Sequence, residues 1–488
     1  MKNQGTLHEF LLRQLLIHCI IGYCLGQRVF LMQTWSPSSW LNYAYLQAID
    51  YPNQDHLTHV LKQLNTLPPL VTSGEIKNLK HAIALAGRGE AFILQGGDCA
   101  ESFADCRSDI IANKLKILLQ MSLVLSHGLR KPIIRIGRIA GQFTKPRSSF
   151  NETVNGITLP SYRGDLVNSP QFTAAARTPN PELLLKGYGC AAMTLNFIRA
   201  LLDGGFADMH HPQQWDVRFV EHSKQASEYR AILSAMIDAI DVLKSIDGTQ
   251  YNRLNNQVFF ASHEALHLHY EQALTRQVPN GHWYNLSTHL PWIGMRTANP
   301  DSAHVEFLRG VQNPIGIKVG PTTTPDVLND LLMILNPHRE EGRILIISRM
   351  GNDHIETHLP KLVDAVKTKN TPVTWSCDPM HGNTELTSDG VKTRQFDTIL
   401  HELQQAVIIH HDMGSHLGGV HFELTGENVT ECMGGARGLD ETDLKHAYQS
   451  LVDPRLNYEQ SLEMAIQLSR QFTTIKKSKL ETRDARTT

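Results

Sequence analysis

The feature that most constrains the fold is a series of eight short apolar segments, each followed by glycine, proline or a charged residue. In order along the chain they are AFILQGGDC at 91, PIIRIGR at 132, QVFFASHE at 257, LPWIGMR at 290, PIGIKVG at 314, RILIISR at 343, PVTWSCDPMH at 372 and GGVHFELTG at 418. Continuous apolar segments of this length are typical of strands buried on both faces, as in a parallel sheet.

Several of the intervening segments have the three- and four-residue periodicity of amphipathic helices. The clearest are residues 107–130, 326–336, 355–367 and 394–407. Strands alternating with helices predict an α/β fold with a parallel sheet and helical crossovers. Eight such units favour a closed (β/α)8 TIM barrel over an open doubly wound sheet, and no G-x-G-x-x-G turn supports the open sheet.

We expect the barrel to cover residues 89–475, with an insertion at about 150–256 between its second and third strands. That interval is too long for a simple crossover, and its apolar spacing predicts a helical pair at 221–245. The preamble before the barrel reads as two amphipathic helices on either side of the Pro68–Pro69 break. The flanking regions are an extension, the helical preamble and a polar tail, at residues 1–31, 32–88 and 476–488.

The segment from Leu11 to Met32 is apolar enough to suggest a signal sequence or a membrane anchor. Polar residues interrupt it at Arg13, Gln14, His18, Gln27 and Arg28. The longest uninterrupted stretch is therefore shorter than the ~20 residues that a membrane span needs, and no small-x-small cleavage site follows. We interpret residues 1–31 as an extension or an upstream start before Met32, and expect no membrane partner.

Composition narrows the functional classes. Across 488 residues, 46 Lys and Arg against 48 Asp and Glu give a formal charge of -2, which does not favour a nucleic-acid partner. The seven cysteines are odd in number, widely scattered and form no C-x-x-C pair, a pattern that suits a reducing cytoplasm. Any affinity for anions must therefore come from a local group of cations.

Each apolar segment ends in a residue with useful chemistry. The eight residues are Cys99, Arg138, Glu264, Arg296, Lys318, Arg349, His381 and Glu423. In a TIM barrel the carboxyl ends of all strands meet at one face, where the active sites of this fold are built. We therefore expect four cations and four potential ligands or acid–base groups around a single opening.

Thiol, imidazole and carboxylate donors among these residues predict a metal centre. Cys99, His381 and Glu423 supply three donors, and Asp453 in the segment VDPRLN supplies a fourth. This mixed set suits Mn, Co, Fe or Zn, and it suits Ca or Mg poorly because those cations prefer oxygen ligands alone. A metal with an open position there would polarise a carbonyl group.

Four cations at one opening repel one another unless an anion neutralises them. Guanidinium groups bind carboxylate and phosphate oxygens in pairs, so a small, highly charged ligand is implied for Arg138, Arg296, Lys318 and Arg349. The segment TKPRSS supplies Lys145, Arg147 and Ser148 for a second phosphate. A substrate with a carboxylate and a phosphate, together with a phosphorylated partner, accounts for this set.

His263, Glu264 and His267 spell H-E-x-x-H, the zinc-protease helix motif. That motif must lie within a helix, whereas this copy directly follows the apolar segment VFFAS and no third ligand has the metzincin spacing. A protease is therefore disfavoured. We interpret the dense histidines His410, His411, His416 and His421 as structural groups or supporting neighbours of a metal site.

These motifs resemble those of the type II 3-deoxy-D-arabino-heptulosonate 7-phosphate (DAHP) synthases, the first enzymes of the shikimate pathway to aromatic amino acids. The resemblance runs from about Trp35 to about residue 470. The segments that carry it are QGGDCAESF, RIGRIAGQFTKPRS, LPSYRGD, SHEALHLHYE, HVEFLRGVQNPIGIKVGP, ISRMGND, CDPMHGNT, HFELTGENVTECMGG and DPRLN.

The resemblance implies roles for individual residues. Cys99, His381, Glu423 and Asp453 correspond to ligands of a divalent metal, usually manganese or cobalt. Arg138, Arg296, Lys318 and Arg349 correspond to the phosphoenolpyruvate site, and Lys145 and Ser148 to contacts with erythrose 4-phosphate. Among these, Cys99, Lys318 and His381 are the expected catalytic residues. The implied reaction condenses the two substrates with water to give DAHP and phosphate.

Departures from the family pattern leave alternatives open. Met295 stands where the family usually has an acidic residue in WIG-x-RT, so a carboxylate is missing beside Arg296 and phosphate affinity or substrate preference is expected to change. Ser415 and Leu417 replace the commoner Thr and Pro. The alternatives are a secondary-metabolic or amino-DAHP synthase and a catalytically weakened regulatory paralogue.

The resemblance also implies partners and assembly. A homo-oligomer, either a dimer or a tetramer, is expected, as is feedback by aromatic amino acids. The preamble and the helical insertion are the expected meeting place of effectors and subunits.

Overall fold

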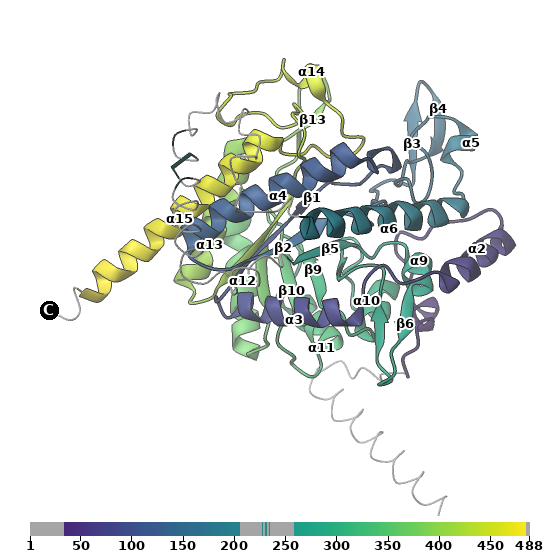
Figure 1. Cartoon of the computed structure of the whole chain (residues 1–488), viewed down its shortest axis with the longest axis horizontal. Coiled ribbons are helices and arrows are strands. Elements are labelled where there is room, and N and C mark those ends of the chain that lie inside the picture. The colour runs from purple at the N-terminus through teal and green to yellow at the C-terminus, as the bar shows by residue number, and fades with distance from the viewer. Residues whose placement is uncertain (1–33, 205–226, 228–229, 232–233, 235–257, 485–488) are drawn as a thin grey trace, which may run out of the picture.

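A closed barrel of eight parallel strands forms the centre of the molecule (Figure 1). The computed structural model describes residues 34–204 and 258–484, together with residues 227, 230, 231 and 234. Around the barrel the strands follow the order β1-β14-β11-β10-β9-β8-β5-β2. Their bounds are β1 Phe92–Gly97, β2 Ile133–Arg138, β5 Phe259–Glu264, β8 Leu290–Ile293, β9 Ile315–Val319, β10 Ile344–Ser348, β11 Thr374–Cys377 and β14 Leu417–Glu423.

Seven of the barrel strands lie within the predicted apolar segments and β14 begins one residue before its segment, at Leu417, so the predicted TIM barrel is confirmed. The register aligns the carboxyl ends of neighbouring strands. Gly97 at the end of β1 pairs with Glu423 of β14 on one side and with Arg138 of β2 on the other. Polar residues that follow different strands are therefore delivered to the same face.

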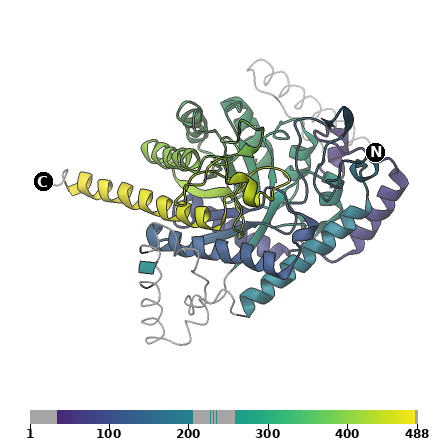
Figure 2. The same ribbon diagram turned by 90° about the horizontal axis from the view of Figure 1, so that it is seen from above.

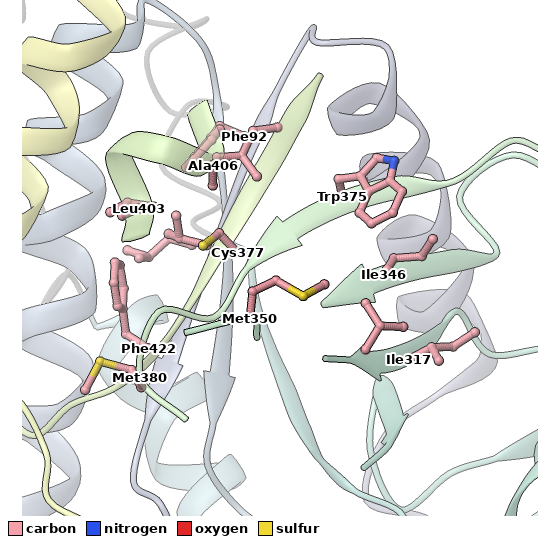
Figure 3. Packing of buried hydrophobic residues seen from close by; sticks show 14 of the residues in the cluster. Phe92, Ile317, Ile346, Met350, Trp375, Cys377, Met380, Leu403, Ala406 and Phe422 are labelled. Atoms are coloured by element: carbon pink, nitrogen blue, oxygen red, sulfur yellow. The ribbon is translucent and has the colours of Figure 1, made fainter. Parts of the chain in front are cut away.

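Helices cover the outside of the barrel. Their bounds are α4 Ser108–Leu129, α5 Ala174–Arg177, α6 Glu182–Asp203, α9 Leu268–Ala273, α10 Ala303–Arg309, α11 Pro325–Leu335, α12 Ile355–Lys369, α13 Phe396–Asp412, α14 Leu444–Ala447 and α15 Tyr458–Asp484. The four helices expected between strands correspond to α4, α11, α12 and α13. Figure 3 shows how apolar side chains of β1, β11 and β14 pack against α13, with Phe92, Cys377, Phe422 and Leu403 in one buried cluster.

Two helices of the preamble, α2 Gln54–Thr66 and α3 Ser73–Gly87, lie on either side of the expected proline break. A capping box begins α3: the Thr72 hydroxyl accepts from the Glu75 amide, and the Glu75 carboxylate accepts from the Thr72 amide. Apolar residues of α3, including Ile83, join the cluster inside the barrel. Thr374, the first residue of β11, donates a 2.9 Å hydrogen bond to the Ile83 carbonyl. Helix α3 therefore closes the end of the barrel opposite the strands' carboxyl ends.

Between β2 and β5 the structure describes a hairpin, followed by α5 and α6. The predicted helical pair at 221–245 and the extension at 1–31 lie outside the described residues, apart from four isolated positions in the pair. Helix α15 runs alongside α4 and continues beyond residue 475 into the expected polar tail (Figure 2). The remaining elements are η1 Ser39–Asn42, β3 Asn151–Val154, β4 Ile157–Pro160, β6 Thr275–Gln277, β7 Trp283–Asn285, β12 Glu385–Leu386 and β13 Lys392–Thr393.

No helix within the described residues combines the length and the apolar character needed to cross a bilayer. The five cysteines in this part of the chain are all free thiols.

Close packing of α4 against α15 gives a prediction for Gly128. A Cβ atom at this position would lie 2.6 Å from the Ser469 Cβ and 3.2 Å from its Cα. Gly128→Ala should therefore lower the free energy of unfolding by about 1–3 kcal/mol, seen as a lower melting temperature. Gly189→Ala is the matched control, because Gly189 is an exposed helical glycine with nothing within 4 Å of the added atom.

The second substitution Ser469→Gly removes the obstructing side chain and should recover part of the loss in the double variant. If the Gly128→Ala protein had the same melting temperature as the Gly189→Ala control, this packing would be contradicted.

Candidate active site

A cavity of about 290 Å³ lies at the carboxyl ends of the barrel strands. Ten of the residues predicted from the sequence line it: Cys99, Arg138, Lys145, Glu264, Arg296, Lys318, Arg349, His381, Glu423 and Asp453. Ser148 is not among the lining residues, but its hydroxyl accepts a hydrogen bond from Arg296 at 3.4 Å. The expected convergence of the strand ends is therefore observed.

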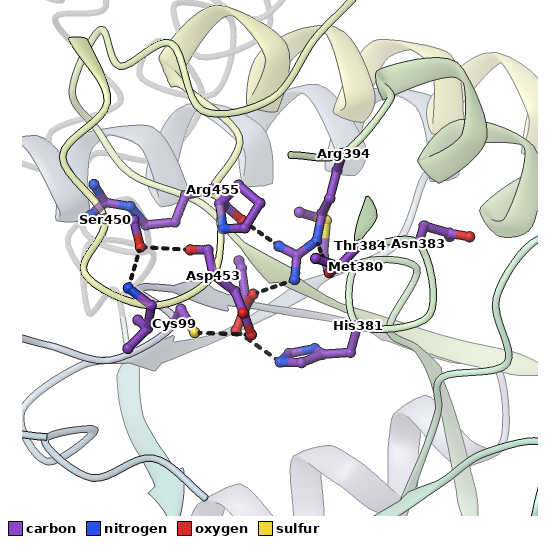
Figure 4. A network of polar contacts seen from close by, with 12 residues as sticks. Cys99, Met380, His381, Asn383, Thr384, Arg394, Ser450, Asp453 and Arg455 are labelled. Carbon is purple, nitrogen blue, oxygen red and sulfur yellow. Dashed lines mark hydrogen bonds and ion pairs between the residues drawn. The ribbon is translucent and has the colours of Figure 1, made fainter. Parts of the chain in front are cut away.

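The potential metal ligands come together from four separate segments. One donor atom each of Cys99, Glu423 and Asp453 lies within 4.8 Å of the others, and the Cys99 Sγ is 3.8 Å from the Asp453 Oδ2. The His381 Nε2 is 2.8 Å from the Glu423 Oε1. Figure 4 shows Cys99, Asp453 and His381 directed toward one another across the end of the barrel. His381, the expected ligand outside this group of three, thus joins it through its contact with Glu423.

The glycine pair before Cys99 explains how the thiol reaches this position. Gly97 ends β1 with a φ of 147°, and a Cβ there would lie 2.5 Å from the Arg138 carbonyl oxygen. Only glycine fits such a close approach in this backbone conformation. The chain can therefore turn inward at once and place Cys99 beside the end of β2.

The donor set fits a divalent transition metal, because it combines a soft thiol with imidazole and carboxylate groups. Burial, reinforced by the charge of Glu423, raises the pKa of the Cys99 thiol to about 12, so a nearby cation is needed to favour the thiolate. Lys145 provides positive charge in this structure: its Nζ is 2.5 Å from the Cys99 Sγ and also contacts the Asp453 carboxylate.

Asp378 orients the imidazole of His381. The Asp378 Oδ2 lies 2.7 Å from the His381 Nδ1 and 2.8 Å from the Lys318 Nζ, while its Oδ1 accepts from the His381 amide. Burial by itself raises the pKa of the Asp378 carboxyl, but His381 and Lys318 hold it well below its usual value. With Nδ1 engaged by this carboxylate, Nε2 is directed toward Glu423 and the other ligands.

The four expected cations differ in how free they are to meet an anion. Arg138 is 2% exposed, and it donates to the Asp98 carbonyl at 2.8 Å, the Cys99 carbonyl at 2.9 Å and Glu423 at 3.1 Å. Arg296 is exposed. The exposure of Lys318, at 7%, and of Arg349, which is half-buried, lies between that of Arg138 and that of Arg296. Arg349 donates to the His381 carbonyl. Protein acceptors thus satisfy much of Arg138, whereas the other three cations face the cavity with fewer such partners.

Met295 contacts a different arginine from the one expected. Its thioether sulfur lies 3.2 Å from an Nη1 of Arg349, and it packs closely against Gly320. A carboxylate is absent at this position, as the sequence indicated, so Arg349 meets a weak acceptor there. Glu264 also lines the cavity, and its pKa is raised by burial, although Lys318 and Arg138 oppose this.

The H-E-x-x-H segment does not form a protease helix. His263 and Glu264 are the last residues of β5, and His267 is the N-cap of α9. The His263 imidazole is 2.8 Å from Glu271 and is buried away from the candidate ligands. The expectation that this motif does not lie within a helix is therefore confirmed.

A model of the class-II DAHP synthetase family matches residues 35–469. Three curated relatives are phospho-2-dehydro-3-deoxyheptonate aldolases. That of Neurospora crassa is 43% identical over 91% of this chain and 96% of its own length. The Streptomyces coelicolor protein is 44% identical over 90% of this chain and 98% of its own length. The protein of Mycolicibacterium smegmatis, named AroG, is 42% identical over 82% of this chain and 87% of its own length.

The chain belongs to the class-II DAHP synthetase family. The resemblance found in the sequence is thereby confirmed, and with it the function as a DAHP synthase that performs the first step of the shikimate pathway. The divalent metal that this family generally uses has a possible site at Cys99, Glu423 and Asp453.

Sequence reasoning missed several buried charged residues that hold the class-II site together. Glu402 of α13 accepts from the Met350 and Gly351 amides at 3.0 Å and from the Asn383 side chain at 2.6 Å. It thereby joins the loop that carries Arg349 to the loop that carries His381. Asp378 was visible in the segment CDPMH, three residues before His381, but Glu402 lies in an ordinary amphipathic helix and gave no signal.

Glu402 generates a prediction about pH. Burial raises the pKa of its carboxyl to about 7, and the Gly351 amide offsets part of that rise. Since the folded pKa exceeds the unfolded one, Glu402 stabilises the fold fully below about pH 4.3, and this stability is lost as pH rises through about 7. Glu402→Gln should remove this dependence, which is on the order of 3 kcal/mol.

The measurement is the melting temperature of both proteins between pH 4 and pH 8. The difference between them should change across this range and stay level above about pH 8. A constant difference throughout would show that Glu402 ionises with an ordinary pKa.

Proposed function

We propose that this class-II DAHP synthase uses Cys99, His381, Glu423 and Asp453 to bind a divalent metal, with Mn²⁺ or Co²⁺ as the best candidates. The proposal is supported by the distances that join these four side chains and by their mixture of sulfur, nitrogen and oxygen donors. Such a metal, when bound, supplies a Lewis acid for an aldehyde carbonyl. In this proposal Lys145 withdraws from the Cys99 thiol when the metal binds.

The cations beside these ligands form the proposed phosphoenolpyruvate site. Arg296, Lys318 and Arg349 line the cavity and would bind carboxylate and phosphate oxygens, since guanidinium groups pair with such oxygens. Arg138 is proposed to face the same substrate while it holds Glu423. Lys318 keeps its place through Asp378, and Arg349 through the His381 carbonyl, so the arrangement is formed before substrate arrives.

Erythrose 4-phosphate is proposed to bind at the side of the cavity formed by the loop after β2. Lys145 lines the cavity, and Ser148 contacts Arg296 at its edge. Glu101 holds the start of this loop, because its carboxylate accepts from the Ala140, Gly141 and Gln142 amides at 2.8–3.0 Å. The phosphate would lie at Lys145 and Ser148, with the aldehyde toward the metal ligands.

In the proposed chemistry, the double-bond electrons between carbons 2 and 3 of phosphoenolpyruvate form a bond from carbon 3 to the aldehyde carbon of erythrose 4-phosphate, and the aldehyde oxygen takes a proton to become a hydroxyl. Water adds at carbon 2 and gives up its protons, and the bond from carbon 2 to the phosphate oxygen then breaks, leaving the keto group of DAHP and inorganic phosphate. Lys318, Arg296 and Arg349 stabilise negative charge on the carboxylate and phosphate oxygens as it moves. The expected catalytic residues are Cys99, Lys318 and His381.

One observation carries the proposal: the thiol, the imidazole and two carboxylates meet in the same cavity as the cations. The direct test is phosphate release from phosphoenolpyruvate in the presence of erythrose 4-phosphate. After chelation, activity should be lost, and added Mn²⁺ or Co²⁺ should restore it. Equal rates with and without the metal would overturn the metal-dependent reaction.

Assembly and regulation belong to the same proposal. We infer a cytoplasmic homo-oligomer, either a dimer or a tetramer, that responds to aromatic amino acids. Support for subunit contact comes from the hairpin β3–β4, where Val154 and Ile157 are 45% and 60% exposed, and from Phe150 just before it at 62%. Exposed apolar side chains grouped in this way are typical of contact surfaces.

Cys99→Ser gives the sharpest prediction for the metal ligands. Serine keeps a similar shape but replaces the soft thiolate with a hydroxyl, so Mn²⁺ affinity and kcat should fall together, by about 10-fold or more. Calorimetric titration with Mn²⁺ measures the first, and phosphate release measures the second. Cys106→Ser is the control, since Cys106 is a free thiol outside the cavity.

Full activity of Cys99→Ser after chelation, in a metal-free assay, would show that the ligand assignment is wrong.

A further inference from the structure

Arg394 is a fully buried arginine that does not line the cavity. It lies between β13 and α13, and its guanidinium reaches three other segments of the chain. Nη2 is 2.8 Å from the Glu423 Oε2, and Nε donates to the Thr384 hydroxyl at 3.0 Å. Nη1 donates to the carbonyl oxygen of Pro454. Figure 4 shows the guanidinium of Arg394 beside this group of residues.

Each of these three segments carries a proposed metal ligand. Thr384 follows His381 by three residues in the loop after β11, and Pro454 is the neighbour of Asp453. Glu423 is itself a ligand, and the arginine contacts it directly. The donors of a planar guanidinium have fixed directions, so the hydrogen bonds to Thr384 and Pro454 hold those two segments in place, and the ion pair with Glu423 ties the third segment to them.

Arg394 also determines how the Glu423 carboxylate is turned. Its contact is with Oε2, whereas His381 and Arg138 approach Oε1 at 2.8 and 3.1 Å. A carboxylate held at both oxygens cannot rotate about its last bond without losing a charged partner. The orientation of Glu423 is therefore set before any metal arrives.

A comparison with Arg343 separates this role from ordinary support of the fold. Arg343 is also buried and uses its three nitrogens to donate to the carbonyls of Leu335, Asn313 and Leu308. It precedes β10, at the opposite end of the barrel from the cavity. Arg343 joins backbone alone, whereas Arg394 also contacts the side chain of a proposed ligand.

We propose that Arg394 is a positioning residue that holds the metal ligands His381, Glu423 and Asp453 in the arrangement that the metal requires. This inference rests on the proposed function, since it presupposes that those residues bind the metal. Supporting residues around a metal site commonly change its affinity by 10–100-fold, and Arg394 would act in that range.

The test compares Arg394→Met and Arg394→Lys with Arg343→Met in the full-length protein. Calorimetry gives the Mn²⁺ dissociation constant of each, and the absorption spectrum of the Co²⁺-loaded protein reports the arrangement of ligands around the ion. We expect Arg394→Met to bind Mn²⁺ about 10–100-fold more weakly and to alter the cobalt spectrum. Arg343→Met should lower the melting temperature while leaving both metal measurements unchanged.

Arg394→Lys keeps the charge but cannot reach three segments, so its Mn²⁺ affinity should fall by an intermediate factor. It also serves if Arg394→Met does not fold. Excess Mn²⁺ should restore its kcat, with little change in the KM for phosphoenolpyruvate. Wild-type Mn²⁺ affinity and an unaltered cobalt spectrum in the folded Arg394 variants would overturn the positioning role.

The same measurements on Cys99→Ser distinguish a failure of the proposed metal site from a failure of the role proposed for Arg394. If it binds Mn²⁺ normally, the metal site itself is wrongly assigned. If it loses Mn²⁺ while the Arg394 variants do not, only the role of Arg394 is wrong.

Discussion

The structure of the active-site end depends on how the buried charge of Glu423 is compensated. A fully buried carboxylate costs several kcal/mol unless cations and hydrogen bonds surround it. His381, Arg138 and Arg394 approach its two oxygens within 3.1 Å, and each comes from a different part of the chain. The pKa of Glu423, which burial alone raises, is held well below its usual value by His381 and Arg394. The same contacts that neutralise this charge therefore fix the strand ends around it.

The barrel makes this compensation possible because its register sets which residues become neighbours. Glu423 and Arg138 end the two strands that flank β1, and Gly97 pairs with both. If the sheet were open between β1 and β2, Arg138 would lie at the edge remote from Glu423, and the two residues could not meet. At the opposite end, α3 closes the barrel with apolar side chains, so among the described residues the polar groups that end the strands gather at the cavity.

The barrel and most of the site could be predicted from the sequence because both depend on local patterns. Each strand is a continuous apolar segment, and residues such as Lys318 and Glu423 lie at the ends of those segments. Asp378 directly follows a strand and could have been found there, whereas Arg394 and Glu402 carry no comparable pattern, because buried contacts between segments far apart in sequence are visible only once the chain is folded. The position of Lys145 between Cys99 and Asp453 was missed for the same reason. The charged residues that line the cavity were foreseen from the sequence, and those that support them mostly were not.

Charge balance connects the metal to the substrates. Five cations and three carboxylates line the cavity, and burial raises the pKa of the Cys99 thiol to about 12 although Lys145 and Arg138 oppose this, which favours the neutral thiol. A divalent cation at Cys99 and Asp453 would increase the excess of positive charge and would compete with the Lys145 ammonium for the same two side chains. The Lys145 ammonium would then lose these two partners, and a phosphate group at the edge of the cavity could replace them as its anion. Metal binding in this way would release the lysine that is proposed to bind the phosphorylated aldose. Under the proposed function, the two roles of Lys145, as partner of the metal ligands and as phosphate contact, would be successive states of one side chain.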